Sequence, residues 1–98
     1  MQVVYRLAAG RDIAEARRWY DGKRMGLGRE FRAAVRVVVD SLVKEHPDSF
    51  PTVHGEVRRA LVTRFPYAIY YQRLDAGTLE IIACLHTRRR PETWRDRG

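Results

Sequence analysis

The amino-acid sequence predicts an α+β fold in which a helical hairpin packs against an antiparallel sheet. Two stretches in the N-terminal half carry apolar residues at helical spacing, and three short apolar segments in the C-terminal half are separated by tight turns. A short apolar strand precedes them all. The chain has 98 residues, which fits a single domain over 1–98. The expected order is therefore β-α-α-β-β-β in two layers, followed by a short C-terminal helical turn.

The N-terminal half is expected to hold one strand and two helices. Residues 2–7 have an apolar centre and predict the strand. Apolar residues then recur at helical spacing along one face of a first helix: Ala9, Ile13, Ala16 and Tyr20. Glycines at 22, 26 and 28 separate it from a second helix over 27–45, which Pro47 ends. The stripe of this second helix is Leu27, Phe31, Val35 (or Ala34), Val38 and Leu42. A short turn between two such helices predicts an antiparallel hairpin.

The C-terminal half is expected to supply the rest of the sheet. Residues 46–55 predict a loop, and strands are predicted at 57–64, 68–74 and 79–85. Their short connections require antiparallel neighbours. The last strand is almost wholly apolar, which is typical of a central strand covered on both faces. Residues 91–96 begin with proline and predict one helical turn.

Positive charge is the strongest signal in the composition. Nineteen lysines and arginines against twelve acidic residues give a net charge of +7, and all but Lys23 and Lys44 are arginine. Planar guanidinium groups suit phosphates and carboxylates, so this surface favours an RNA, DNA or acidic protein partner. An alternative interpretation is a solubilising surface without a specific partner.

The single cysteine and the absence of a long apolar run set further limits. With only Cys84, no internal disulfide can form, and the reducing cytoplasm is the expected compartment. Cys84 lies within an apolar run and is interpreted as a small buried side chain rather than a nucleophile. No run of about 20 apolar residues is present, so no membrane association is expected.

Several local segments resemble the RelE/ParE superfamily of toxins from type II toxin–antitoxin systems. Residues 12–20 resemble the first helix of these toxins, and 26–31 resemble the start of the second. The strand pair within 57–71 is closest to ParE-like members. Residues 85–94, with His-x-Arg near their start, resemble the last strand and tail. The resemblance spans nearly the whole chain in the expected order.

The resemblance implies a toxin that is silenced by a cognate antitoxin. RelE-like members cut messenger RNA on the ribosome, whereas ParE-like members inhibit DNA gyrase, so the fold alone does not choose between them. The implied partner is an acidic, ParD- or RelB-like antitoxin in a hetero-oligomer. No cofactor or metal is implied. A third possibility is a decayed toxin that retains only antitoxin binding.

The positions of the RelE catalytic pattern favour the ParE-like function. Where that pattern holds an arginine and a catalytic tyrosine, this chain has Ala68 and Trp94. Arg88 matches a basic position, and His86 has the titration range of a general acid. A nuclease would therefore use His86 and Arg88 as its catalytic residues. The alternative for His86 is a histidine bonded within the fold at the end of its strand.

The predicted binding residues fall into two groups. Target binding is assigned to six arginines and one tryptophan: Arg58, Arg59, Arg64, Arg88, Arg89, Arg90 and Trp94. Trp19 and Tyr20 are predicted to anchor the antitoxin in a groove between the hairpin and the sheet, although hairpin core is an alternative for both. Arg58, Arg59 and 88–90 are expected to form its charged rim. At least one of the tyrosines 67, 70 and 71 should belong to the core, because they alternate between faces of one strand.

Overall fold

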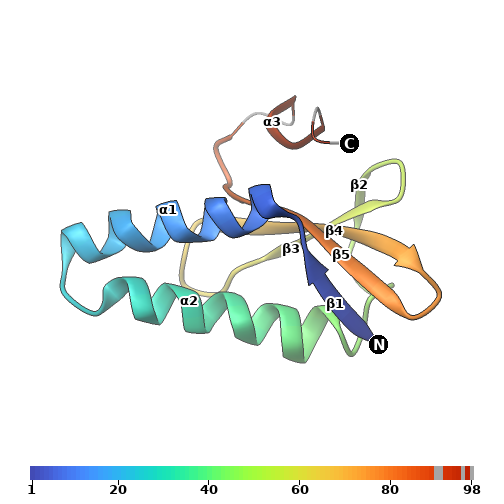
Figure 1. Ribbon diagram of the computed structural model, residues 1–98, viewed down its shortest axis with the longest axis horizontal. Coiled ribbons are helices and arrows are strands. Elements are labelled where there is room, and N and C mark those ends of the chain that lie inside the picture. The colour runs from blue at the N-terminus through green and yellow to red at the C-terminus, as the bar shows by residue number, and fades with distance from the viewer. Residues whose placement is uncertain (90–91, 96, 98) are drawn as a thin grey trace.

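The computed structural model describes residues 1–89, 92–95 and 97, with the side chains of 42 and 92 left aside. Its elements are β1 (Gln2–Tyr5), α1 (Leu7–Lys23), α2 (Leu27–Val37), a π-helical turn η1 (Val38–Val43), β2 (Thr52–His54), β3 (Val57–Leu61), β4 (Tyr67–Asp75), β5 (Thr78–His86) and a single helical turn α3 (Glu92–Arg95). The predicted α+β architecture is confirmed. Figure 1 shows α1 and α2 running side by side on one side of the sheet, with α3 set apart from them.

The five strands form one sheet in the order β1-β5-β4-β3-β2. As predicted, β3, β4 and β5 are antiparallel neighbours. The expectation of a wholly antiparallel sheet is wrong for β1, which pairs with β5 in parallel. The short-turn argument does not apply to this pair, because most of the chain separates the two strands. The predicted loop also contains the edge strand β2, whose three exposed residues carry no apolar alternation that could have indicated it.

The sheet has an apolar cluster on each face, and a bulge shifts the side-chain alternation within β5. Tyr70 pairs with Ala83 but Tyr71 pairs with Ile81, so β5 holds one extra residue, Ile82. Ile82 and Ala83 consequently both belong to the apolar cluster on the outer face, away from the hairpin. Tyr71 and Ile81 belong to the larger core beneath the hairpin. Tyr70 and Tyr71 are both buried, so the expectation that at least one of these tyrosines is core is confirmed.

The two helices approach each other most closely at the hairpin turn. Gly26 begins α2 in the left-handed region, with φ of 87°. The backbone N–H of Gly28 donates to Asp21 Oδ1 (2.8 Å), and a Cβ at position 28 would lie 2.6 Å from that oxygen. Glycine is therefore required at position 28 for the helices to meet.

The second helix ends with a widened turn. The N–H of Lys44 donates to the carbonyl oxygen of Val39 (2.9 Å), five residues back. Val38, Val39 and Val43 are all fully buried. The predicted helix over 27–45 thus exists as α2 followed by η1, and the predicted core position Leu42 lies outside the described side chains. Within the described residues, no helix is both long and apolar enough to cross a membrane.

Candidate functional site

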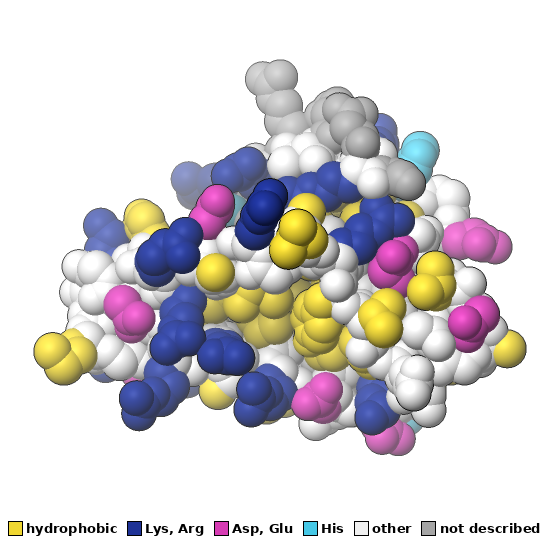
Figure 2. Space-filling model, in the orientation of Figure 1, with side chains coloured by type: hydrophobic (Ala, Val, Ile, Leu, Met, Phe, Trp, Pro, Cys, Tyr) yellow, Lys and Arg dark blue, Asp and Glu magenta, His cyan; other side chains and the backbone are white. Residues whose placement is uncertain are grey.

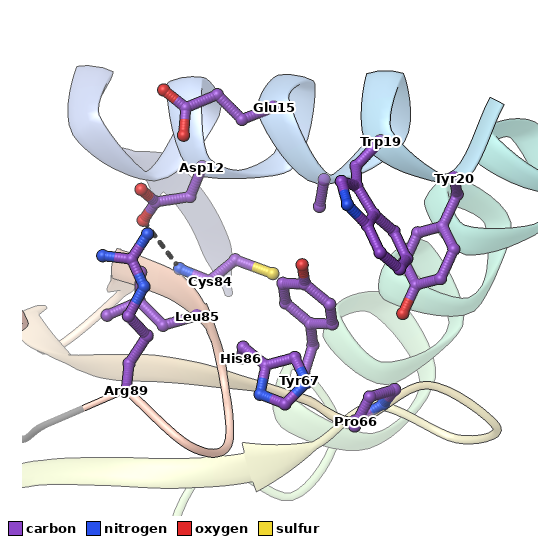
Figure 3. A pocket seen from close by; sticks show the side chains of 11 residues that line it. Asp12, Glu15, Trp19, Tyr20, Pro66, Tyr67, Cys84, Leu85, His86 and Arg89 are labelled. Carbon is purple, nitrogen blue, oxygen red and sulfur yellow. Dashed lines mark hydrogen bonds between the residues drawn. The ribbon is translucent and has the colours of Figure 1, made fainter. Parts of the chain in front are cut away.

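The first candidate site is a cavity of about 490 Å³ where α1 meets the ends of β4 and β5. We call it the sheet groove. It is lined from α1 by Asp12, Glu15, Ala16, Trp19 and Tyr20, and from the sheet side by Pro66, Tyr67, Cys84, Leu85, His86 and Arg89. Figure 3 shows Trp19, Tyr67 and His86 bordering this space. The fold therefore brings predicted antitoxin anchors together with residues predicted to act on the target.

The two aromatic residues predicted as anchors have different environments. The side chain of Trp19 is 56% exposed, and Lys23 Nζ lies 4.7 Å from the centre of its ring. Tyr20 is 8% exposed and packs among aromatic rings, with centroids 5.3 Å from Phe31 and 5.0 Å from Phe65. Tyr20 is thus a core residue that only borders the groove. Trp19 is free to contact another chain, and its role as an anchor stays a prediction.

The groove also contains an open edge of the sheet. β1 pairs with β5 only as far as Ile81, because the chain then turns into α1. Beyond that point the backbone N–H of Cys84 points away from β4 and donates to Asp12 Oδ2 (3.0 Å). His86, two residues on, faces the same edge by the alternation of the strand. No strand covers this edge among the described residues.

A C-terminal arginine closes one end of this edge. Arg97 donates to both carboxylate oxygens of Asp12, with Nη1–Oδ2 at 2.6 Å and Nη2–Oδ1 at 3.0 Å. The Asp12 side chain is only 10% exposed, and hydrogen bonding to it raises the pKa of Arg97. Arg6 in turn donates to the carbonyl oxygen of Arg97 (2.6 Å) and pairs with Glu80 (3.0 Å). Asp12 therefore ties α1, β5 and the C-terminal segment together.

His86 is held by the fold rather than by a catalytic partner. Its Nδ1 accepts the backbone N–H of Arg88 (3.1 Å), and its ring lies edge-on to Tyr67 at 5.4 Å. Arg88 does not line the groove that His86 enters, whereas Arg89 does. The predicted catalytic pair His86–Arg88 is thus not assembled in one cavity. The arrangement agrees with the alternative interpretation of a structural histidine.

The tail tryptophan is buried on the outer face of the sheet. Trp94 is 3% exposed and stacks on Tyr70, with a centroid distance of 4.9 Å and an interplanar angle of 24°. Ala68, the other position that departs from the RelE pattern, is fully buried in the same cluster. The prediction that Trp94 faces a target is therefore wrong. Among the described residues, no helix other than the single turn α3 lies on the outer face, so the tail supplies its large apolar side chain.

The predicted target-binding arginines do not form one surface. Arg58 donates to the carbonyl oxygens of Phe50 and Asp48. Arg64 pairs with Glu30 (3.1 Å), and hydrogen bonds from Arg64 and Arg24 lower the pKa of that carboxyl. Arg59 lies opposite Tyr70 on the outer face, partly buried.

The charged rim expected for the sheet groove is correspondingly reduced. Of the described arginines predicted to form it, Arg89 alone lines this groove. Arg58 borders a separate small cavity, where it meets Pro47 and Tyr71. Arg88 is exposed, and Arg90 lies outside the described residues.

A second cavity, of about 760 Å³, opens on the other flank of α1. We call it the hairpin groove. It is lined by Tyr5, by α1 residues Gly10, Ile13, Ala14, Arg17, Arg18 and Asp21, and by Arg32, Val35, Arg36 and Asp40 from α2 and η1. Figure 2 shows basic side chains gathered along the hairpin beside a hollow with an apolar floor. The sequence interpretation missed this site, although Arg32 and Arg36 stand one helical turn apart and offered a signal.

The described residues contain no cluster of three or more His, Cys, Asp or Glu side chains placed to hold a metal ion. Burial raises the pKa of the Cys84 thiol to about 12, and the nearby Asp12 carboxylate adds to this shift. Cys84 therefore stays a neutral thiol at physiological pH, which supports its interpretation as a packing residue rather than a nucleophile.

Comparison with known proteins gives one kind of match. No protein-family model and no curated protein sequence matches the chain. Among solved structures, it is similar to a chain described as "Chromosomal ParDE TA system from P. aeruginosa", with a TM-score of 0.64 and 17% identity over 88% of this chain and 95% of that one. At this identity the likeness concerns the fold. It agrees with the α+β fold that the sequence predicted.

Proposed function

We propose that this protein is the toxin of a type II toxin–antitoxin system and acts as a ParE-like inhibitor of DNA gyrase. The observation that carries the toxin part of the proposal is the shared fold with a ParDE chain over 88% of the sequence, whereas the choice of gyrase rests on the packing of the outer face. The net charge of +7 supports it, because it suits an acidic antitoxin.

The packing of the outer face of the sheet favours a toxin that inhibits gyrase by binding it, rather than one that cleaves RNA. Cleavage needs a cation to stabilise charge on the phosphate and a group that donates a proton. At the two positions where the RelE pattern supplies such groups, Ala68 and Trp94 are buried in an apolar cluster. Trp94 also covers Tyr70. An RNA phosphate placed beside Ala68 and Trp94 would contact apolar side chains, whereas cleavage requires charged groups at these positions.

The sheet groove is the proposed antitoxin site. Trp19 offers an exposed aromatic ring at its rim, and aromatic anchors commonly dominate binding energy at interfaces. No strand pairs with β5 beyond Ile81 among the described residues, and because Asp12 already binds the N–H of Cys84, the edge near His86 is where an incoming strand would pair. We expect an acidic antitoxin whose C-terminal part is disordered alone and orders along this groove.

A ribosome-dependent endoribonuclease is the second candidate function. The presence of His86, Tyr67 and Arg89 around one cavity favours it, since together they could supply a titrating group and a cation. A toxin that has decayed to antitoxin binding alone is the third.

Growth of bacteria under induced expression tests the proposal. We expect arrest when the chain is expressed alone, and recovery when a cognate acidic antitoxin, encoded beside it, is co-expressed. The Gly28→Val variant is a matched control, because its side chain would collide with Asp21 and disrupt the hairpin. Normal growth at verified levels of soluble, folded wild-type protein would contradict the toxin function.

A further inference from the structure

The hairpin groove is tight at the hairpin turn and open at its other end. At the turn, the N–H of Gly28 donates to Asp21 Oδ1, and a Cβ at position 28 would collide with that carboxylate. Further along α1, a Cβ at Gly10 would meet no atom within 4 Å. Asp21 and Gly10 both line the cavity, so it runs about 17 Å along α1 at a rise of about 1.5 Å per residue.

Positive charge is concentrated at the turn end of this groove. Three arginines line that end: Arg17, Arg18 and Arg32. None of the three forms an ion pair with a described residue. Asp21 is the carboxylate beside them, so three guanidinium groups against one carboxylate leave a local charge of +2. At the open end, Arg36 and Asp40 both line the groove and their charges cancel.

The floor between the two ends is apolar. It is formed by Ile13, Ala14 and Val35. Val35 is 3% exposed and Ile13 packs against the core beneath the hairpin, so the floor is continuous with the protein interior. Tyr5 lines the open end with an aromatic ring. Figure 2 shows the basic side chains over the part of the hairpin nearer its turn, with the apolar hollow beyond them.

We infer that the hairpin groove binds a small anionic amphiphile, a single alkyl or acyl chain that ends in a carboxylate or a phosphate. The anionic group would meet the guanidinium forks at the turn end, whose geometry suits both kinds of anion. The chain would lie on the floor and reach Gly10 and Tyr5, which removes its hydrocarbon from water. The volume of about 760 Å³ lies within the range of about 300–1,000 Å³ that is usual for small-molecule sites.

The separation of charge from apolar surface selects this class of ligand. A nucleic-acid strand repeats its charge at every nucleotide, whereas the unpaired cations of this groove are confined to one end. A small inorganic anion would leave the apolar floor exposed to water. This ligand site goes beyond the toxin function and does not depend on it, because α1 separates the hairpin groove from the sheet groove.

Isothermal titration calorimetry on the purified full chain tests the site with four probes, each kept below its micelle-forming concentration. Dodecanoate and dodecyl phosphate share one chain and distinguish a carboxylate from a phosphate head. Dodecyl maltoside has the same chain with a neutral head, and inorganic phosphate has no chain. We expect a single molecule of an anionic dodecyl probe to bind per chain, at least about tenfold more tightly than dodecyl maltoside. Inorganic phosphate should show no binding in the same concentration range.

A glycine substitution tests whether the alkyl chain occupies the open end. Gly10→Leu should fill this end without a backbone clash, and leucine favours a helix more than glycine does. Affinity for the anionic probe should fall by about tenfold or more, because displacing two methylene groups from the groove already has an effect of that size. Gly22→Leu is the matched control: it lies in the same helix, has the same free space and does not line the groove. It should leave affinity unchanged.

A pair of arginine substitutions tests the position of the anionic group. Arg17→Gln with Arg32→Gln should weaken binding of the anionic probe by about tenfold and leave dodecyl maltoside unaffected. The control pair, Arg11→Gln with Arg29→Gln, removes the same net charge at exposed positions outside the groove. It should change affinity by less than about twofold.

Four results would overturn the proposed site, provided that circular dichroism shows the variants folded. The first is equal affinity for anionic and neutral dodecyl probes, and the second is undiminished binding in Gly10→Leu. The third is an equal loss in both arginine pairs, which would trace binding to the net charge of the chain. The fourth is binding of several probe molecules per chain, which would indicate adsorption over the whole surface. Since no toxicity is measured, failure here leaves the toxin proposal to its own growth test.

Discussion

The helical hairpin and the C-terminal tail each place a tryptophan beside basic side chains, yet they use it differently. Trp19 is 56% exposed beneath Lys23, whereas Trp94 is 3% exposed and stacked on Tyr70. In the hairpin, Tyr20 already fills the core, so its neighbour remains at the surface. In the tail, Trp94 covers an outer face of the sheet that no other helix of the described structure reaches. An aromatic residue among cations therefore indicates a binding surface only where the core beneath it is already complete.

The largest predicted effect is the difference in unfolding free energy between alanine variants of the two tryptophans. Trp94→Ala removes a buried ring and should lower the free energy of unfolding by about 3 kcal/mol. Trp19→Ala should lower it by less than about 1 kcal/mol, because the ring is mostly exposed. Urea denaturation of both variants measures the difference. Equal losses would mean that the tail is not packed on the sheet as described.

The sequence predicts some elements of the fold well and others not at all. The helices of the hairpin follow from apolar spacing over several turns, and the strands β3, β4 and β5 from short turns between apolar segments. The parallel pairing of β1 with β5 could not be predicted, because it joins segments that lie far apart in the chain. The strand β2 could not be predicted, because its three residues are exposed and carry no apolar alternation.

The candidate site was predictable only in part. Trp19, His86 and Arg89 were identified as functional candidates and do share one groove. The arginines at 17, 18, 32 and 36 were not identified as a group, since each alone is typical of an exposed helix position. Their convergence depends on how α1 lies against α2. The burial of Trp94 depends on the tail folding back over the outer face.

The next largest predicted effect is the loss of unfolding free energy when the Asp12–Arg97 ion pair between the hairpin and the tail is removed. Asp12→Ala leaves the guanidinium of Arg97 and the N–H of Cys84 without their partner, and should lower the free energy of unfolding by about 2 kcal/mol. Glu15→Ala, one turn further along α1, is the control and should cost less than about 0.5 kcal/mol, since Glu15 is exposed and forms no ion pair within the described structure. Chemical denaturation compares them. Indistinguishable losses would show that the Asp12–Arg97 pair does not hold the tail.

The smallest effect uses the neighbouring tyrosines on the two sheet faces. The Tyr71 hydroxyl donates to the carbonyl oxygen of Pro47 (2.6 Å), and burial raises the pKa of Tyr71 from 10.0 to about 12. Because folding raises the pKa of Tyr71, the folded state favours its neutral phenol over the phenolate. Its contribution to stability is complete below pH 10 and is lost as the pH rises towards 12.

In the wild type, the free energy of unfolding should fall between neutral pH and about pH 11, in part because the Tyr71 phenol ionises more readily in the unfolded chain. In Tyr71→Phe this fall should be smaller by about 1 kcal/mol. Tyr70→Phe, on the outer face, is the matched control, because none of the hydrogen bonds among the described residues involves its hydroxyl. Denaturation of each variant at a series of pH values gives the comparison. A Tyr71→Phe profile as steep as that of the wild type would show that the Tyr71 phenol does not titrate in the folded state as its burial implies.

We propose that this protein inhibits gyrase by binding it and does not cut RNA. The most direct measurement is supercoiling of relaxed plasmid by purified gyrase with increasing amounts of the chain, beside a translation reaction in which messenger RNA cleavage is mapped. We expect supercoiling by gyrase to fall as the amount of the chain rises, and messenger RNA to stay intact in the translation reaction. Unaffected supercoiling together with ribosome-dependent cuts that disappear in His86→Ala would contradict it and establish the nuclease instead.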